Sequence, residues 1–346
     1  MRLAPVGQVV AITSHGVRLG GLTNRGSSGS DHQRPSLAFP AKLSRILPIV
    51  LPYRFRHLKR SRIGSMTDNS SSGRSSFQVR VLRQDHPGGS QRWEEYDVPY
   101  EANLNITSVL QKIAALGTTA NGQSSAPVAY EANCLEEVCG SCTMIVNGRV
   151  RQACSALVDR LLEEKPEGIE LAPMSKFPVL RDLVVDRGRM FQALERVGAW
   201  VGVDDYYDRG AGPKESQAQQ ETRYPLSECM TCGCCVEACP QYTKVELTQR
   251  AGEQQKDFQE RKKAEYGTAF VGPAAISQAM LFNEHGTGQM AADERLDALM
   301  GPGGIQACGN AQNCVSVCPK SIPLTTSIAR AGRQTTVYAI KKLFGR

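Results

Sequence analysis

The spacing of the cysteines restricts the fold of this chain more than any other feature. All 12 cysteines of the 346-residue sequence lie between Cys134 and Cys318, in two groups of short, regular runs. A disulfide scaffold typically has cysteine at ~8–10% of a short secreted chain, with looser spacing. These cysteines are too few and too tightly spaced for that class of protein. The pattern therefore indicates thiolate ligands for metal sites.

The first group has the spacing C-x4-C-x2-C, with a fourth cysteine after eleven further residues. This is the plant-type [2Fe–2S] arrangement, in which a short loop surrounds two irons and the fourth thiolate comes from a nearby strand. Gly140 and Ser141 are small enough for backbone N–H groups to approach the sulfurs, which helps to set the reduction potential. A zinc site is the alternative, although zinc sites usually pair two short knuckles. The predicted [2Fe–2S] ligands are Cys134, Cys139, Cys142 and Cys154.

The residues around this group predict a β-grasp ferredoxin domain over 76–175. The helix of this domain is expected to start at Thr107 or Ser108 and to end at Gly117. Alternating apolar residues and tight turns predict the strands. The expected elements are strands over 77–82, 93–98, 143–146 and 149–151 and a helix over 109–116.

The second group contains the bacterial ferredoxin run C-x2-C-x2-C-x3-C-P and, about seventy residues later, C-x5-C-x3-C-P. In such ferredoxins, three cysteines on one turn hold a cubane cluster, and the fourth binds the other cluster. The two runs are therefore expected to exchange their last cysteines. The predicted [4Fe–4S] ligands are Cys229, Cys232, Cys235 and Cys318, and the other cluster receives Cys239, Cys308 and Cys314.

The last of these sites lacks one ligand, because a complete run would have cysteine where this chain has Ala311. Alanine offers no donor atom, so three thiolates favour a [3Fe–4S] cluster. A labile fourth iron with an outside ligand is the alternative. Cys234 is left over between two predicted ligands, and we interpret it as a small buried residue beside the cluster.

Residues 176–346 predict an all-helical, bacterial-ferredoxin-like domain, which makes the fold class α+β. A polar stretch with glycines and no periodicity, 201–222, is expected to be a surface loop. The expected helices include 189–200, 247–266, 274–283 and 327–343.

Positive charge is concentrated at the start of the chain. Residues 1–65 hold eleven Lys or Arg and one acidic residue, whereas the remainder holds 30 basic and 33 acidic residues. The mildly acidic remainder argues against a nucleic-acid partner. Residues 1–75 are rich in Ser and Gly without periodicity, which predicts a disordered extension. The alternatives for 1–65 are a transit peptide, a basic arm for an anionic membrane surface, or sequence upstream of a true start at Met66.

The remaining motifs narrow the class of function. The sequence has no apolar run near the ~18–20 residues that cross a bilayer. It also has no histidine constellation for acid–base chemistry, no phosphate-binding glycine loop and no dinucleotide fingerprint. Three clusters without a site for substrate chemistry predict a one-electron relay, with no catalytic residues in this chain.

The cysteine order, with FPVLRDLVVDR at 177–187 and NCVSVCPKSIP at 313–323, resembles the iron–sulfur subunit of succinate dehydrogenase and fumarate reductase. The resemblance extends from about Phe77 to the C-terminus. It implies a subunit of respiratory complex II, an oxidoreductase of the tricarboxylic acid cycle. The expected partners are a FAD-containing flavoprotein and a membrane anchor. Electrons would pass from FAD through [2Fe–2S], [4Fe–4S] and [3Fe–4S] to quinone.

Two departures from the family pattern concern the quinone. Many ubiquinone-linked relatives have tryptophans soon after the Cys-Pro, where this chain continues from Pro240 to Gln241. They also have histidine after the cysteine that matches Cys308, where this chain has Gly309. These three residues, Pro240, Gln241 and Gly309, are the candidates for contact with quinone. The CGNAQNC string favours the menaquinone-linked branch, whose anchor is a dihaem cytochrome b.

The resemblance also implies a location and leaves further functions open. The subunit would lie peripherally on the cytoplasmic face of a bacterial inner membrane, or on the matrix face in mitochondria if 1–65 is a transit peptide. Fumarate reductase differs only in working direction. An iron–sulfur adaptor of another flavoenzyme would use the same clusters, and a structural zinc protein would use the same thiolates.

Overall fold

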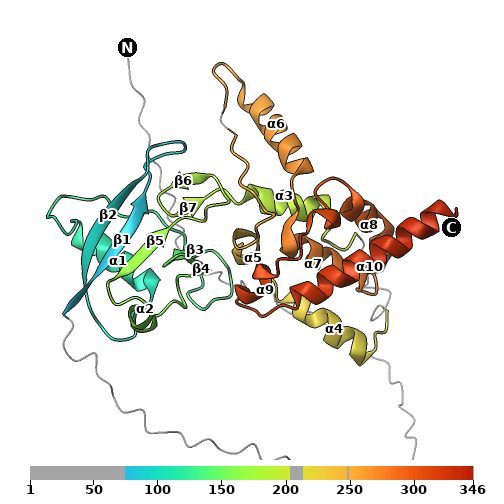
Figure 1. Ribbon diagram of the computed structural model, residues 1–346, viewed down its shortest axis with the longest axis horizontal. Coiled ribbons are helices and arrows are strands. Elements are labelled where there is room, and N and C mark those ends of the chain that lie inside the picture. Colours follow the sequence, from blue (N-terminus) through green and yellow to red (C-terminus); the bar gives the residue numbers. More distant parts are fainter. Residues whose placement is uncertain (1–74, 203–212, 248, 346) are drawn as a thin grey trace, which may run out of the picture. The chain divides into compact units, whose positions relative to one another are not determined.

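The computed structural model describes residues 75–202, 213–247 and 249–345, which include all the cysteines. The extension predicted for 1–75 lies outside the described residues except for its last residue, and so do positions 203–212 of the predicted loop. In the described residues, a sheet in the first half is followed by helices in the second (Figure 1).

The first half is built on a five-stranded sheet with the order β2-β1-β5-β3-β4, in which only the β1–β5 pair is parallel. Its strands are β1 (Ser76–Arg83), β2 (Arg92–Pro99), β3 (Thr143–Val146), β4 (Arg149–Gln152) and β5 (Ile169–Ala172). The predicted strands are thus present. Side chains alternate between the two faces of a strand, so Phe77, Val79 and Val81 enter the same core.

Two helices complete this core, α1 (Ile106–Leu116) and α2 (Val158–Glu164). The predicted end of α1 at Gly117 is confirmed, with φ 64° in the left-handed region. The predicted start is wrong. The cap is Asn105, whose side chain accepts a hydrogen bond from the backbone N–H of Ser108 at 2.9 Å. Asparagine is among the best N-cap residues because its side-chain oxygen satisfies a free N–H of the first turn.

A short two-stranded sheet, β6 (Val179–Arg181) and β7 (Val184–Val185), follows. The stretch predicted to be all-helical from residue 176 therefore begins with strands. Leu183 in the turn packs into the core of the first half, whereas Val179 and Val185 pack with the helices that follow. The buried apolar residues of this short hairpin are divided between two cores and have no helical period, which explains why strands replace the predicted helix.

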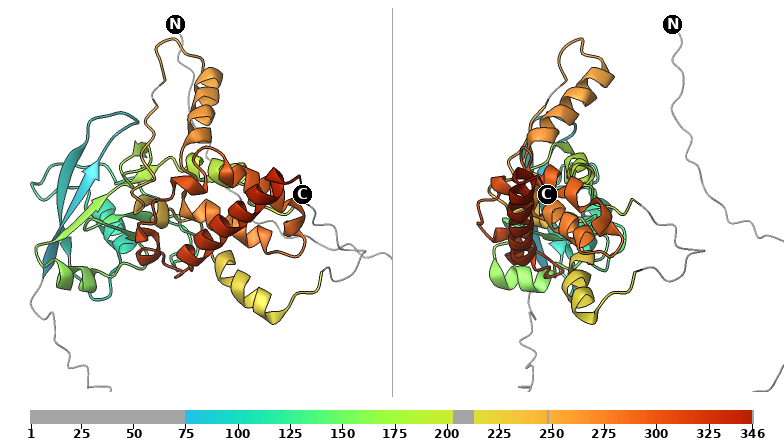
Figure 2. Two further views of the ribbon diagram at one scale, coloured as in Figure 1. Left: turned by 45° about the vertical axis from the view of Figure 1, so that its right-hand side comes forward. Right: turned by 90° about the vertical axis from the view of Figure 1, so that its right-hand side faces the viewer.

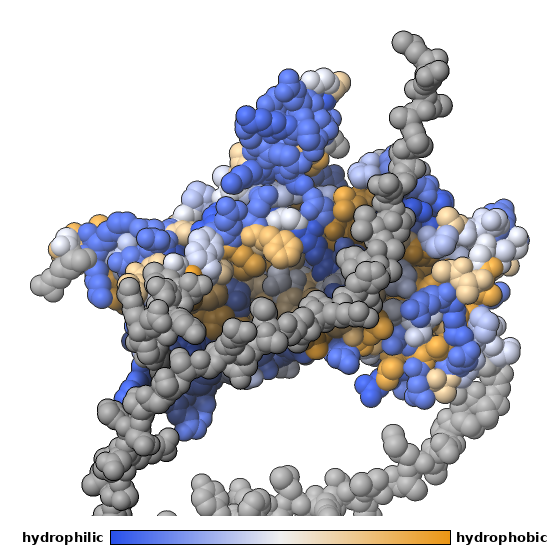
Figure 3. All heavy atoms as spheres, turned by 180° about the vertical axis from the view of Figure 1, so that it is seen from behind, coloured by the Kyte–Doolittle hydropathy of each residue, from blue (hydrophilic) through white to orange (hydrophobic). Residues whose placement is uncertain are grey.

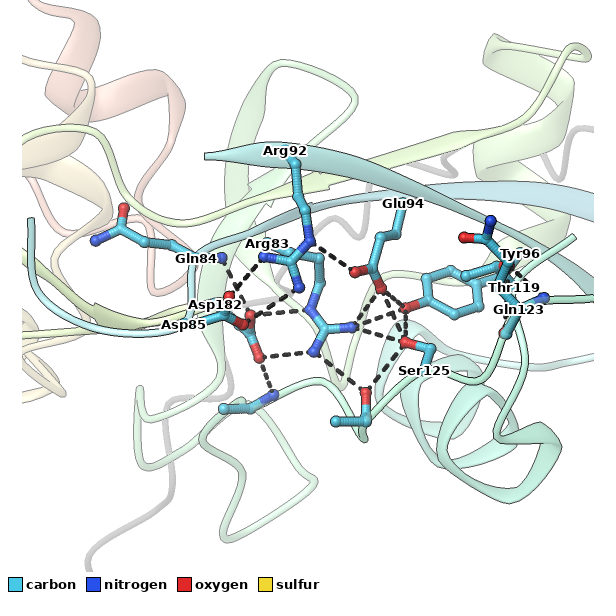
Figure 4. Close-up of polar contacts among 12 residues, drawn as sticks. Arg83, Gln84, Asp85, Arg92, Glu94, Tyr96, Thr119, Gln123, Ser125 and Asp182 are labelled. Carbon is cyan, nitrogen blue, oxygen red and sulfur yellow. Dashed lines mark hydrogen bonds and ion pairs between the residues drawn. The ribbon is translucent and has the colours of Figure 1, made fainter. Parts of the chain in front are cut away.

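Asp182 in this turn anchors the strand pair to the large sheet (Figure 4). Its carboxylate is fully buried and accepts hydrogen bonds from Arg83 Nε at 2.9 Å and from the backbone N–H of Ala129 at 2.8 Å. Arg83, 1% exposed, also donates to Glu94 at 2.7 Å and to the Tyr96 hydroxyl at 2.8 Å. Every charge in this buried network is therefore paired.

Replacing Arg83 with methionine is expected to lower the free energy of unfolding by about 3–5 kcal/mol, because the Asp182 carboxylate would stay buried without its cation. The measurement is the thermal unfolding midpoint of the assembled protein. Arg80→Met is the matched control. The ion pairs of Arg80 are partly exposed, so its loss should cost below about 1 kcal/mol. Equal losses for the two variants would contradict the assigned role of the network.

The second half consists of helices in the described residues from 188 onward, and α7 lies at their centre with ten buried residues. The helices are α3 (Gly188–Arg196), α4 (Gln217–Ser227), α5 (Cys234–Glu237), α6 (Gln255–Thr268), α7 (Gly272–Asn283), α8 (Ala292–Met300), α9 (Asn313–Ser316) and α10 (Leu324–Leu343), with 3-10 turns η1 (Gly288–Ala291) and η2 (Ile305–Ala307). The four predicted helices are present, although α3 ends early and α6 starts late. Gly252, with φ 78°, lies in a turn before α6.

The predicted surface loop over 201–222 is wrong for its last residues, which belong to α4. Ser216 forms a capping box, because its side chain accepts from the N–H of Gln219 while the Gln219 side chain accepts from the N–H of Ser216. A Ser-x-x-Gln sequence is a recognised start signal for a helix, and it outweighs the polar composition.

Helix α6 stands away from the neighbouring helices in both further views, and its surface is largely hydrophilic (Figures 2 and 3). Only Tyr266 of this helix is buried. Among the described residues, no helix combines the length and the hydropathy that a membrane crossing requires.

Candidate metal centres

The first cysteine loop lies between α1 and β3 and has an alternating backbone conformation. Leu135, Glu137 and Gly140 all have φ between 55° and 73°, in the left-handed region. Alternation of right- and left-handed residues turns successive N–H groups toward one point and creates a concave anion-binding site, as in many iron–sulfur proteins. The N–H groups of Glu136, Val138 and Cys139 all lie 3.3–3.4 Å from Cys134 Sγ.

Other hydrogen bonds in this loop favour the thiolate form of Cys139. The Ser141 hydroxyl, 3.4 Å from Cys139 Sγ, and backbone N–H groups lower the pKa of Cys139 to about 6. Burial and the neighbouring Cys142 raise the pKa of Cys154 to about 11. Cys142 and Cys154 are buried, whereas Cys134 and Cys139 are partly exposed. The structure thus brings the four predicted ligands of the first site to one loop and its adjoining hairpin.

The two later cysteine runs share one backbone pattern. In the first run, Thr231 and Gly233 are left-handed, with φ 51° and 92°, and a short helix begins at the next residue, Cys234. In the second run, Asn310 and Gln312 are left-handed, with φ 53° and 61°. A helix of the same length begins directly after Gln312. The two runs therefore match residue by residue.

This match gives each cysteine a counterpart and identifies one exception. Cys229, Cys235 and Cys239 of the first run correspond to Cys308, Cys314 and Cys318 of the second. The position that corresponds to Cys232 holds Ala311, and Cys234 corresponds to Asn313. The second loop therefore has the shape of a three-cysteine turn with a methyl group at its central ligand position.

The predicted exchange of the last cysteines is consistent with a cavity that four cysteines share. Cys229, Cys232, Cys235 and Cys318 all line it, together with apolar side chains from α7 and α10. Cys234 lines the same cavity and is 1% exposed. Burial raises the pKa of the Cys314 thiol, and so do the charges of Cys239 and Cys308, which places these three near one another.

The three residues predicted beside the quinone lie at an exposed edge. Pro240, Gln241 and Gly309 are all exposed. A Cβ atom on Gly309 would lie 2.5 Å from Gln241 Nε2, so the Gln241 side chain occupies the space that a larger residue at 309 would need. Residues 310–313 are exposed as well. The third cysteine site therefore has one side open.

The sequence interpretation missed how closely the first two cysteine loops approach. A Cβ atom on Gly140 would lie 2.8 Å from Cys232 Cα, so only glycine fits there. Arg187 lies across the junction and donates hydrogen bonds to the carbonyl oxygens of Gly140, at 2.7 Å, and Ser141. Arg187 ends the string 177–187 that carried the resemblance, but its role depends on contacts that sequence spacing does not reveal.

Replacing Arg187 with methionine is expected to lower the thermal unfolding midpoint by about 4–8 °C. Two loop carbonyls would lose a charged donor, which is worth about 2 kcal/mol in total. Arg187→Lys should recover less than half of the loss, since lysine lacks the planar fork that reaches both oxygens. Arg149→Met is the surface control and should change the midpoint little. A fully stable Arg187→Met protein would contradict the assigned contact.

The residues present suit iron–sulfur clusters. The donor sets are thiols in tight loops that point N–H groups at sulfur, and soft thiolates favour such clusters. In the described residues, no three His, Cys, Asp or Glu side chains are positioned to hold one metal ion. In a cubane cluster each thiolate binds a different iron, and in a [2Fe–2S] cluster two thiolates bind each iron, so three side chains do not converge on a single ion.

Comparison with known families gives a match for each half. Residues 78–192 match a 2Fe-2S iron-sulfur cluster binding domain, and residues 225–322 match a 4Fe-4S dicluster domain. The chain therefore contains ferredoxin-type domains of both kinds, in the predicted order. The first match extends through the β6–β7 pair into α3.

The chain is also similar in sequence to individual iron–sulfur subunits. The chain is 44% identical to the succinate dehydrogenase iron-sulfur subunit of Bacillus subtilis, over 79% of this chain and 98% of that protein. It is 28% identical to the fumarate reductase iron-sulfur subunit of Escherichia coli, over 67% of this chain and 82% of that protein.

The fold is also similar to that of a solved structure. A chain of the Mycobacterium smegmatis Sdh1 complex in the apo form aligns with a TM-score of 0.56 at 21% identity, covering 75% of this chain and 95% of that one. The 44% identity over nearly the whole Bacillus protein assigns the chain to a family. It belongs to the family of succinate dehydrogenase and fumarate reductase iron–sulfur subunits.

Proposed function

We propose that the chain is the electron-transfer subunit of a membrane-bound succinate:quinone oxidoreductase, and that it relays single electrons from a flavoprotein to quinone. The observation that carries this proposal is the series of cysteine sites. The first two loops touch at Gly140 and Cys232, and a third site repeats the backbone of the second. As a member of its family, the chain is a component of an oxidoreductase complex and an iron–sulfur protein.

The proposed ligands follow the matched loops. The N–H groups that converge on the first cysteine loop support thiolate ligands there. The cavity that four cysteines share supports a single set of four ligands for the second cluster. The methyl group of Ala311 supports a three-iron cluster in the third. The sets are Cys134, Cys139, Cys142 and Cys154 for [2Fe–2S], Cys229, Cys232, Cys235 and Cys318 for [4Fe–4S], and Cys239, Cys308 and Cys314 for [3Fe–4S].

The bound clusters supply one-electron redox chemistry. The chain's own residues hold the thiolates, exclude water and set the local charge. Cys232, Cys235 and Cys314 are buried, so interactions with their sulfurs are little screened by solvent. Together with the Cys234 thiol, the Arg187 cation lowers the pKa of Cys232 to about 7, which favours the ligating thiolate. No substrate step is assigned to this chain.

The finer fold is part of the proposal. The mixed sheet with α1 against it supports a β-grasp domain over 76–175. The matched cysteine turns and the helices around α7 support a bacterial-ferredoxin-like domain over 176–346, with the β6–β7 pair at its start.

The proposed partners are a FAD-containing flavoprotein and a membrane anchor that binds quinone. The exposed edge at Pro240, Gln241 and Gly309 supports contact with the anchor near the third site. Menaquinone and a dihaem cytochrome b anchor are the specific choices we propose. The subunit would then lie peripherally on the cytoplasmic face of a bacterial inner membrane.

The test is low-temperature EPR of the purified complex, oxidised and then reduced stepwise, with iron and sulfide counted on the same sample. A three-iron signal when oxidised is expected, with a [2Fe–2S] signal and a spin-coupled [4Fe–4S] signal on reduction. Two four-iron clusters, or zinc without sulfide, would overturn the ligand assignment. Purification without a haem-containing anchor would favour an adaptor of another flavoenzyme.

Working direction is a separate question, since fumarate reductase subunits are also among the relatives. The test compares the rates of succinate oxidation with quinone and of fumarate reduction with quinol in one preparation. A faster rate of succinate oxidation supports the proposed direction. The reverse ratio would make the chain a fumarate reductase subunit.

A further inference from the structure

Gln152, the last residue of β4, lies between the first two cysteine sites. Its side chain is 1% exposed, and both of its amide atoms face sulfur. Oε1 lies 3.5 Å from Sγ of Cys142, a proposed [2Fe–2S] ligand. Nε2 lies 3.5 Å from Cys234 Sγ and 2.7 Å from Thr143 Oγ1. One buried amide thus spans the junction.

Cys234 is the cysteine to which the proposed function gives no task. It is 1% exposed and lies between the proposed ligands Cys232 and Cys235. Cys234 belongs to none of the proposed ligand sets, so it is a thiol rather than an iron-bound thiolate. A thiol that keeps its proton can donate one hydrogen bond and accept others.

The chemistry of an amide restricts how this contact can work when Cys142 binds iron. A ligating cysteine has no proton, so a carbonyl oxygen beside it would face a negative sulfur without a donor between them. A half-turn of the Gln152 amide removes the conflict, and the two orientations differ only in which atom is N and which is O. The N–H then donates to Cys142 Sγ. Oε1 accepts from the Thr143 hydroxyl, which turns from the Gly140 carbonyl oxygen that Arg187 also binds, and from the S–H of Cys234, which turns from Cys232.

We propose that Gln152 donates a hydrogen bond to the Cys142 thiolate, and that Cys234 is a positioning residue that holds the amide in this orientation. The two residues would form a hydrogen-bonded link between the first two cluster sites. This inference rests on the proposed function, because it assumes a cluster at each site.

The consequence is a higher reduction potential at the first site. The reduced state has one more electron and no compensating proton, so its ligands are more negative. A donor to a ligand sulfur stabilises that state and raises the potential. Gln152 and Cys142 are both buried, so water does not replace the lost donor when Gln152 is removed.

The test measures the [2Fe–2S] midpoint potential of the intact complex by EPR-monitored titration. Gln152→Leu is expected to reduce the one-electron equilibrium constant about tenfold, a fall of about 59 mV. Cys234→Ala should shift the potential the same way by less, and Cys234→Ser should stay near the unaltered value. Gln84→Leu is the matched control, since Gln84 is a buried glutamine whose side chain bonds to the His86 carbonyl oxygen and to Gln91.

A double variant tests whether Cys234 acts through Gln152. If it does, Cys234→Ala shifts the potential in the unaltered chain but adds nothing to Gln152→Leu. Additive shifts would overturn the positioning role. An unchanged potential in Gln152→Leu with full cluster content would overturn the hydrogen bond. Loss of [4Fe–4S] in Cys234→Ser would make Cys234 a ligand and also overturn the inference.

Two further measurements apply if Gln152→Leu does not assemble or if the clusters are absent. If Gln152→Leu does not assemble, pulsed EPR of the unaltered complex in 1H2O and 2H2O replaces it. An exchangeable proton coupled to reduced [2Fe–2S], altered in Cys234→Ala and retained in Cys234→Ser, supports the link. The same coupling in all three proteins would contradict it. Absence of clusters from the unaltered complex would instead be a failure of the proposed function.

Discussion

Cys229→Ala and Cys318→Ala are expected to abolish the same EPR signal, that of the [4Fe–4S] cluster, although the two residues lie in different runs of the chain. Both cysteines line one cavity with Cys232 and Cys235. Removing either takes one thiolate from the same four-iron site. Quinone reductase activity should be lost in both variants, because the middle of the relay is missing.

The controls separate this result from general misfolding. Cys308→Ala should remove the three-iron signal instead, and all these variants should keep the [2Fe–2S] signal, which depends on a different core. Cys234→Ser should keep all three signals. If Cys229→Ala and Cys318→Ala removed different signals, the exchange of last cysteines between the two runs would be wrong.

Ala311→Cys is expected to convert the three-iron cluster to a four-iron cluster. Ala311 follows a left-handed residue and precedes another, as Cys232 does in the matched loop, so a new thiol at 311 would have the backbone geometry of a ligand. A fourth thiolate also adds negative charge, which lowers the reduction potential. Electron delivery to quinone should therefore slow.

The measurement is the three-iron EPR signal of the oxidised complex, which should disappear while the iron count rises by one per protein. Asn313→Cys is the matched control. It adds an exposed cysteine in the same loop, at the position that corresponds to the non-ligand Cys234, and it should leave the three-iron signal unchanged. An unaltered cluster in Ala311→Cys would contradict the missing-ligand explanation.

The predicted cysteine sites rest on sequence spacing because their information is local. Three ligands of each loop lie within a few residues of one another, and the loop conformation depends on short-range hydrogen bonds. The gap at Ala311 is visible for the same reason. Strands such as β1 were predictable from the alternation of Phe77, Val79 and Val81. The start of α4 is also a local signal, the capping box at Ser216. The polar composition of the segment favoured a loop, so the sequence analysis did not predict this helix.

Only the tertiary structure decided the contacts between these local units. Arg83 and Asp182 form a buried ion pair across ninety-nine positions. Arg187 binds loop carbonyls, and Gln152 meets Cys234 across eighty-two positions. None of these partners has a characteristic spacing, because each depends on how separately folded elements pack. Sequence spacing therefore determined which atoms bind iron in our proposal, whereas packing decided which side chains adjust the charge and hydrogen bonding around those atoms.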